Sequence, residues 1–238
     1  MKTVLALIPT FNRKELVALT SGYLRRIRFD PARFAFLVSD DCSTEYGLGF
    51  LREAYASLPN VTFMKTSANS GALRHMWVLL RHFAQTDRDK VLVLDSDLVV
   101  DQSCLGWIDA FDADPISSLY NSSRHAVAER RDGYCVKRDI GWAGALIDRS
   151  VIRGMLDSYG SRPFDDWKLS EVASKLELTI KVALPSAIEH IGIFGSNNFG
   201  TELFDHSIDF PRERFDPTTR HYFLHKHRID LLRPWGST

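Results

Sequence analysis

Residues 3–13 read TVLALIPTFNR, and this stretch decides the fold. Thr3–Ile8 is a continuous apolar run with β-branched members, which is typical of a strand buried on both faces of a sheet. The following segment, Asn12–Arg28, spaces leucines among polar residues and predicts a helix with Asn12 as its N-cap. A buried strand that leads through a short turn into a helix is the first half of a βαβ unit.

The same alternation continues through the first half of the chain. Further strands are predicted at Arg33–Val38, Val61–Lys65 and Lys90–Leu94, and further helices at Gly47–Leu58 and Ala72–Phe83. Strands that alternate with helices through short connections predict parallel pairing, with helices on both faces of the sheet. The expected fold class is therefore α/β: a Rossmann-like single domain with a mixed, mainly parallel sheet.

The second half of the chain is less regular. It predicts strands at Pro115–Tyr120, Thr179–Leu184 and Ala187–Ile191, a charged hairpin or loop at Arg124–Arg138, an apolar segment at Trp142–Ile147, and helices at Val151–Ser158 and Trp167–Leu178. After Gly192 the pattern is loop-like, and from Phe210 onward arginine and histidine are frequent. We expect one domain over residues 1–200 and a basic extension over residues 201–238 that packs on or over the site.

Composition narrows the function classes. The chain has 238 residues, 45% hydrophobic and 25% charged, and its 30 basic residues balance 30 acidic ones. This balance argues against a general electrostatic attraction to nucleic acid or anionic lipid. The early apolar run Val4–Ile8 is far shorter than the roughly 20 residues that span a bilayer. Three widely spaced cysteines indicate neither a disulfide framework nor a zinc cluster, so we expect a cytoplasmic protein.

Polar residues gather where three predicted strands end. Pro9, Thr10, Asn12 and Arg13 follow the first strand, Asp40, Asp41 and Ser43 follow the second, and Asp95, Ser96 and Asp97 follow the fourth. Ligands of open α/β sheets bind beyond the carboxyl ends of the strands, so we expect Asp41 and Asp97 to face one cleft. Carboxylates that converge there repel one another unless a cation or a donor-rich ligand is bound. The alternative is that Asp40, Ser43 and Asp95 only cap turns or a helix.

Several sequence elements, taken in order, resemble the family-2 glycosyltransferases with the GT-A fold. They are the run Ile8–Arg13, the turn Asp40–Thr44, Asn69-Ser70-Gly71 before a helix, the DxD triplet Asp95–Asp97 after an apolar strand, the acidic pair Asp165–Asp166 before a helix, and His190. Each element alone is a weak signal. Their shared order over about 190 residues makes the resemblance specific.

For the donor, the resemblance implies that Asp41 accepts a hydrogen bond from a nucleotide base. Pro9 and Asn12 would shape the floor of the pocket, and Asp95 would lie near the ribose. The other donor-binding candidates are Thr10, Arg13, Asn69, Gly71, Arg74 and Ser96. The implied donor is a nucleoside diphosphate sugar, with a UDP-sugar favoured.

For the chemistry, the resemblance implies a divalent cation, Mn²⁺ or Mg²⁺, bound by Asp97 and His190 and bridging the donor diphosphate. Such a cation stabilises the negative charge that develops on the leaving diphosphate. A carboxylate of the acidic pair would take the proton of the acceptor hydroxyl as general base, either Asp166 or its neighbour Asp165. One base opposite the leaving group gives direct displacement with inversion.

The sequence leaves the acceptor open among a glycan, a lipid-linked sugar, a protein and a modified DNA base. Candidate acceptor-binding residues are Trp142, Gly144 and Trp167, although tryptophan and glycine at such positions also serve core packing. Three roles are open for the basic tail: covering the diphosphate, contacting an anionic acceptor such as DNA, or forming a solvated surface.

Two other functions compete with glycosyl transfer. A non-catalytic nucleotide-binding domain of the same fold would not need acidic residues at both the metal and the base positions. A sugar nucleotidyltransferase needs a glycine-rich basic loop after the first strand, which Pro9–Asn12 does not supply. Neither a GxGxxG fingerprint nor a P-loop motif occurs, so a nucleotide would be held by side chains and metal.

Overall fold

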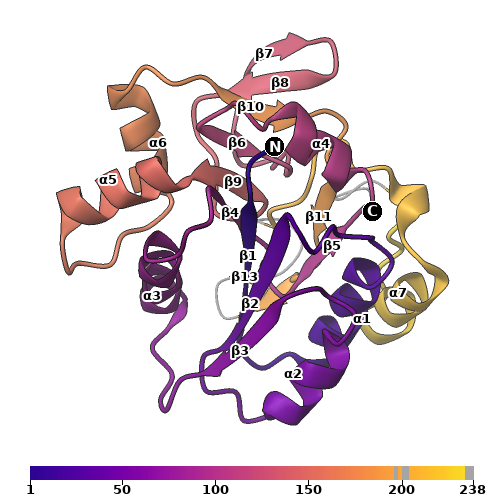
Figure 1. Ribbon diagram of the computed structural model, residues 1–238. Coiled ribbons are helices and arrows are strands. Elements are labelled where there is room, and N and C mark those ends of the chain that lie inside the picture. Colours follow the sequence, from indigo (N-terminus) through magenta and orange to yellow (C-terminus); the bar gives the residue numbers. More distant parts are fainter. Residues whose placement is uncertain (196–197, 200–203, 234–238) are drawn as a thin grey trace.

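The structure is a computed structural model that describes residues 1–195, 198–199 and 204–233. A nine-stranded sheet forms its centre, with helices on both faces (Figure 1). In spatial order the strands are β3 (Val61–Lys65), β2 (Phe34–Asp40), β1 (Val4–Thr10), β4 (Lys90–Val93), β9 (Ala145–Asp148), β6 (Ile116–Ser118), β10 (Ile180–Ala183), β8 (Tyr134–Lys137) and β7 (Val127–Arg131). The α/β class predicted from the sequence is confirmed.

Strand β1 lies inside the parallel half of the sheet. It pairs in parallel with β2 on one side and β4 on the other, and β2 pairs in parallel with β3. Val4, Ala6 and Ile8 pack into the core on one face, whereas Leu5 and Leu7 pack into the core on the other. Because successive side chains of a strand point to opposite faces, a strand covered on both sides needs the unbroken apolar run seen in the sequence.

Helices cover both faces of the sheet. They are α1 (Lys14–Leu24), α2 (Leu48–Ala54) and α4 (Cys104–Ala110) on the first face, and α3 (Ala72–Ala84), α5 (Arg149–Tyr159) and α6 (Trp167–Lys175) on the second. Every strand and helix predicted from the first half of the sequence is present.

The other half of the sheet introduces antiparallel pairs. Strand β9 runs antiparallel between β4 and β6, and the hairpin β7–β8 is added antiparallel to β10. The hairpin uses the charged segment that the sequence left as hairpin or loop, and Gly133 provides a positive φ of 78° in its turn. The apolar segment at 142–147 supplies β9.

A separate pair of strands begins directly after the DxD triplet. Strand β5 (Leu98–Val100) pairs antiparallel with β11 (Ile188–His190), so that His190 stands opposite Leu98. A further short pair consists of β12 (Phe194–Gly195) and β13 (Asn198–Phe199). Part of the segment after Gly192 that the sequence predicts as a loop lies outside the described residues.

The predicted N-cap of the first helix is wrong. Helix α1 begins at Lys14, and both Asn12 (φ 50°) and Arg13 (φ 56°) adopt the left-handed conformation before it. The Asn12 side chain faces the neighbouring loop, where its Oδ1 accepts the Thr44 N–H at 2.9 Å. The Lys14 N–H is instead bound by the Glu45 carboxylate at 2.8 Å. A side chain from another loop has therefore replaced the local cap.

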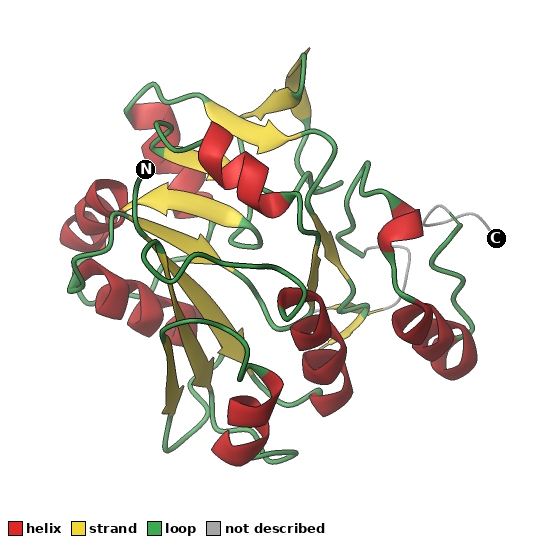
Figure 2. Cartoon of the chain, turned by 45° about the vertical axis from the view of Figure 1, so that its right-hand side comes forward, coloured by secondary structure: helices red, strands yellow, loops and turns green. Residues whose placement is uncertain are grey.

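The described part of the tail is folded against α1. Its elements are a 3₁₀ turn (Arg212–Arg214), helix α7 (Pro217–Tyr222) and a π-helical turn (Phe223–His227). Phe210, Phe215 and Phe223 are buried in a core shared with Leu16 and Tyr23 of α1, and Figures 1 and 2 both place α7 beside α1. The division of the chain at residue 200 stays a prediction.

We expect Tyr23→Phe to weaken the docking of the tail. The Tyr23 hydroxyl accepts the Asp216 N–H at 2.8 Å and donates to Thr219 Oγ1 at 3.1 Å in a buried setting. Loss of a buried hydrogen-bond partner costs about 1–3 kcal/mol, which urea unfolding would measure. Tyr159→Phe, on α5 and remote from the tail, is the matched control. Equal stability of the two variants would contradict this role.

Candidate active site at the carboxyl edge of the parallel strands

The loop after β1 contacts predicted site residues in the loops after both neighbouring strands, β2 and β4. The Asn12 N–H donates to Ser43 Oγ at 2.7 Å, and the Asn12 side chain accepts from the Thr44 N–H in the loop after β2. The next residue, Arg13, points the other way and donates from Nη1 to Asp97 Oδ2 at 2.7 Å. Two consecutive left-handed residues thus turn neighbouring side chains toward opposite flanks of β1.

Asp41 organises the loop that precedes α3. Its carboxylate is 2% exposed and accepts the N–H of Ser70 at 3.0 Å, the Ser70 hydroxyl at 2.9 Å and the N–H of Gly71 at 2.9 Å. Burial alone would raise the pKa of Asp41, but the Ser70 hydrogen bonds hold that pKa below its usual range. Asn69 donates to the Asp41 carbonyl at 3.2 Å, whereas Arg74 is exposed at the start of α3.

Asp40 and Ser43 fit the capping alternative. Asp40 is fully buried, its Oδ1 accepts the Ser43 N–H at 2.9 Å, and its Oδ2 is paired with Lys65 at 2.8 Å. These contacts hold the turn together.

Asp97, Arg13 and His190 form a buried charge cluster. His190 Nε2 lies 3.1 Å from Asp97 Oδ2, the oxygen that also receives the Arg13 guanidinium. Burial opposes both charges, but their attraction prevails, so the pKa of Asp97 is well below its usual range and that of His190 is raised to about 9. The pairing of β5 with β11 brings these residues together from distant parts of the chain.

Asp95 lies beside this cluster and has different electrostatics. Burial, followed by the negative charge of Asp97, raises the pKa of Asp95 to about 7. The adjacent Ser96 is buried, and its carbonyl accepts the Thr20 hydroxyl of α1 at 2.8 Å. Of the triplet, Asp95 and Asp97 can therefore serve a ligand, while Ser96 anchors the turn to α1.

Gly192 is required by the cluster. A Cβ at this position would overlap Asp97 Oδ2 and lie 2.9 Å from His190 Nε2. The opposite nitrogen of His190, Nδ1, is 3.1 Å from the Asp205 carbonyl, and the His190 ring stacks on Phe204 with centroids 5.1 Å apart. An Nδ1–H bound to that carbonyl leaves Nε2 as the ring atom that faces Asp97.

The acidic pair stands at the start of α6. Asp166 is half-buried and occupies the N-cap position without a capping hydrogen bond from its side chain, whereas Asp165 is exposed. Burial raises the pKa of Asp166, and its charge contributes to the raised pKa of Asp95. Asp166 is thus the half-buried member of the pair, and its Oδ2 lies 3.2 Å from the position that a Cβ at Gly141 would take.

His125 is a site residue that sequence reasoning missed. It lies between β6 and β7, and its ring meets that of Trp167 edge-on with centroids 6.2 Å apart. A Cβ at Gly141 would lie 3.2 Å from Asp166 Oδ2 and 3.8 Å from His125 Nε2, which places both groups around one glycine. A single histidine in a charged segment carries no motif, so only the folded chain identifies it.

The three acceptor-binding candidates differ in exposure and packing. Trp167 is 64% exposed beside Asp166. Trp142 packs near Phe164, with ring centroids 6.3 Å apart. Gly144, at φ 69°, is buried where a Cβ would lie 2.9 Å from Tyr120 Cβ, so the packing alternative accounts for it. Trp167 alone presents a large aromatic surface next to the acidic pair.

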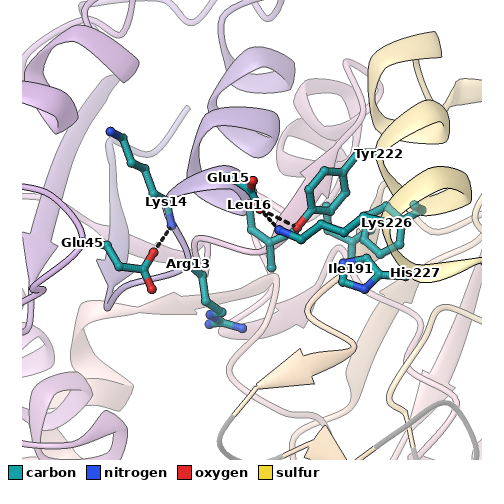
Figure 3. A pocket seen from close by; sticks show the side chains of 10 residues that line it. Arg13, Lys14, Glu15, Leu16, Glu45, Ile191, Tyr222, Lys226 and His227 are labelled. Carbon is teal, nitrogen blue, oxygen red and sulfur yellow. Dashed lines mark hydrogen bonds and ion pairs between the residues drawn. The ribbon is translucent and has the colours of Figure 1, made fainter.

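A pocket of about 320 Å³ lies between the start of α1 and the tail (Figure 3). Its lining includes Arg13 and Ile191 from the site and Tyr222 and Lys226 from the tail. Lys226 extends across to an ion pair with Glu15. The tail thus borders the site beside Arg13, and the ammonium group of Lys226 is paired with Glu15.

Within the described residues, no group of three or more His, Cys, Asp or Glu side chains could hold a metal ion by itself. The same part of the chain contains no helix long and apolar enough to cross a bilayer.

Comparison with known sequences identifies the family. Residues 6–134, more than half of the chain, match the family described as glycosyl transferase family 2. The chain therefore belongs to glycosyl transferase family 2. A search of curated proteins found no significant match.

Solved structures share the fold at low identity. S. aureus TarS 1-349 superposes with a TM-score of 0.56 at 19% identity, covering 78% of this chain and 59% of that one. The same protein in complex with UDP-GlcNAc gives 0.57 at 18% identity, covering 78% and 57%. The mannosyltransferase PcManGT from Pyrobaculum calidifontis, in complex with GDP-Man and Mn²⁺, gives 0.53 at 17% identity, covering 76% and 56%. The fold is that of GT-A glycosyltransferases, and the chain spans less than two-thirds of the length of these structures.

Gly192→Ala should destabilise the protein by about 1–3 kcal/mol, because the added methyl group forces Asp97 or His190 to move. Gly106→Ala is the control: nothing lies within 4 Å of its Cβ position in α4, so a neutral or stabilising effect is expected. Urea unfolding would measure both. In an Asp97→Ala background the cost of Gly192→Ala should shrink. An unchanged cost there would show that the crowding lies elsewhere.

Proposed function

We propose that this protein transfers a glycosyl group from a nucleoside diphosphate sugar to an acceptor hydroxyl, with inversion and with the help of a divalent cation. The observation that carries this proposal is the cluster of Arg13 and His190 around the buried Asp97, together with the half-buried Asp166 beside Gly141. Membership of glycosyl transferase family 2 supports the reaction class. A UDP-sugar is the favoured donor, since TarS was solved with UDP and with UDP-GlcNAc, although PcManGT was solved with GDP-Man.

The donor half of the site consists of the loops after β1, β2 and β4. Asp41 would meet the nucleotide base together with the Ser70–Gly71 segment that its carboxylate holds in place. Asp95, next to the charge cluster, would lie near the ribose. Arg13 carries a fixed positive charge at the place where the diphosphate would need one.

The donor atoms present fit a hard divalent cation. Asp97 would supply a carboxylate oxygen and His190 would supply Nε2, which lies 3.1 Å from it, while Nδ1 faces the Asp205 carbonyl. Because the pKa of His190 is raised to about 9, a bound cation would displace the Nε2 proton and would share the Asp97 carboxylate with Arg13. Mg²⁺ and comparable ions are often bound by one or two protein groups and complete their shell with substrate phosphates and water. When bound, the cation supplies electrostatic stabilisation of the negative charge on the leaving diphosphate.

Asp166 is the proposed general base. Burial raises the pKa of its carboxyl group, which makes the carboxylate a better proton acceptor than that of an exposed aspartate. It would take the proton of the acceptor hydroxyl as that oxygen attacks the anomeric carbon. Asp165 is exposed beside it and would support the turn or contact the acceptor.

Asp97→Asn should abolish cation-dependent donor binding and transfer, because the carboxamide has no charge to attract a cation. Thermal stabilisation by UDP-sugars with and without Mn²⁺ would measure donor binding, and release of free nucleoside diphosphate would measure transfer. Pyrophosphate release would instead indicate a nucleotidyltransferase. Asp157→Asn, exposed on α5, is the control. Full activity in excess chelator, together with a wild-type rate in Asp97→Asn, would refute the metal role.

Asp166→Asn should lower the transfer rate by about 10²–10⁴ while donor affinity survives. Asp165→Asn should transfer at a rate close to wild type. In the wild-type protein the rate should fall as pH drops through the raised pKa of Asp166, because the protonated carboxyl cannot accept a proton. If only Asp165→Asn is inactive, the neighbouring residue is the base.

A further inference from the structure

Two polar side chains lie beside the backbone of Gly141. Asp166 Oδ2 and His125 Nε2 both approach the place that a side chain at Gly141 would fill. Gly141 is not among the glycines with positive φ, so its backbone does not require glycine. Its lack of a side chain instead allows the Asp166 carboxylate to approach the backbone, since Oδ2 would lie only 3.2 Å from a Cβ there.

An exposed aromatic ring borders the same space. Trp167 directly follows Asp166, is 64% exposed, and meets the His125 ring edge-on. An exposed indole face is a suitable surface for the C–H face of a sugar ring, while the polar groups beside it can bind hydroxyls.

The local charges favour a neutral ligand. Burial lowers the pKa of His125, so its imidazole is neutral at pH 7, with one ring nitrogen able to donate and the other to accept. The charges acting on it are the carboxylates of Asp139, Asp166 and Asp205 and the ammonium group of Lys137. A phosphate placed over Gly141 would lie next to the Asp166 carboxylate, and like charges at such a distance repel, which favours an acceptor with a neutral group there.

We infer that the acceptor is a neutral carbohydrate whose ring stacks on Trp167 and whose reacting hydroxyl sits over Gly141, between Asp166 and His125. The inference rests on the proposed glycosyl transfer and adds the class of acceptor. In this arrangement His125 binds a hydroxyl of the acceptor and Asp166 receives the proton of the attacking one. The C–O bond to the acceptor forms as the bond to the leaving diphosphate breaks.

The first experiment uses methyl glycosides as probes. Saturation-transfer NMR with methyl hexopyranosides and methyl N-acetylhexosaminides, in the presence of UDP and Mg²⁺, should detect binding of at least one sugar. Trp167→Ala should lose this signal, and Trp167→Phe should keep it because an aromatic face remains. Leu176→Ala, an exposed apolar residue at the end of the same helix, is the control. Equal signals in Trp167→Ala and wild type would overturn the inference.

The second experiment measures transfer to the sugar that binds best. Gly141→Ala and His125→Gln should each reduce kcat/KM for the acceptor by 10-fold or more, with donor affinity within twofold of wild type. Gly154→Ala and His82→Gln, at exposed positions on α5 and α3, are the matched controls. Unchanged kcat/KM in both test variants, or transfer to a DNA oligonucleotide but to no glycoside, would overturn the inference. A wild-type protein that binds no nucleotide sugar would instead refute the proposed function itself, and the acceptor class with it.

Discussion

The burial of the Asp97 carboxylate is the constraint on which the site depends. Asp97 is 4% exposed, and an isolated buried charge is too costly to persist without a partner. Its partners are Arg13 from the loop after β1 and His190 from β11, residues far apart in sequence. Satisfying one carboxylate therefore requires three distant segments to converge. This convergence favours glycine at position 192, because a Cβ there would overlap the Asp97 carboxylate.

The same contacts connect the tail to the site. The Asp205 carbonyl contacts His190 Nδ1. The Ser207 N–H donates to Glu189 Oε1 at 2.8 Å, directly next to His190. Further along, Tyr23 and Thr219 join the tail to α1, the helix that follows Arg13. The tail is thus a structural part of the site's surroundings. Its cations Lys226 and Arg214 are paired with Glu15 and Asp101, which argues for a scaffolding role over a DNA-binding one.

In the proposed reaction, the parallel half of the sheet serves the donor and the antiparallel half serves the acceptor. The parallel strands β1, β2 and β4 end in the loops proposed to hold the donor. The segments around the antiparallel strands present Gly141, His125 and the start of α6 on the acceptor side. The raised pKa of Asp95 comes first from burial and then from the charge of Asp97, and the charge of Asp166 adds to it.

The sequence by itself determined the parallel half of the fold and the family. An unbroken apolar run such as Thr3–Ile8 suits only a strand covered on both faces, and the polar clusters after such strands meet at one edge for geometric reasons. Tertiary structure decided the rest. Asn12 does not cap α1, because the loop after β2 binds its side chain instead. The antiparallel insertion of β9, the contact of His190 with Asp97 and the position of His125 all depend on pairing between distant segments. Local patterns carry no information on such long-range contacts, since burial and charge pairing are settled only when the whole chain has folded.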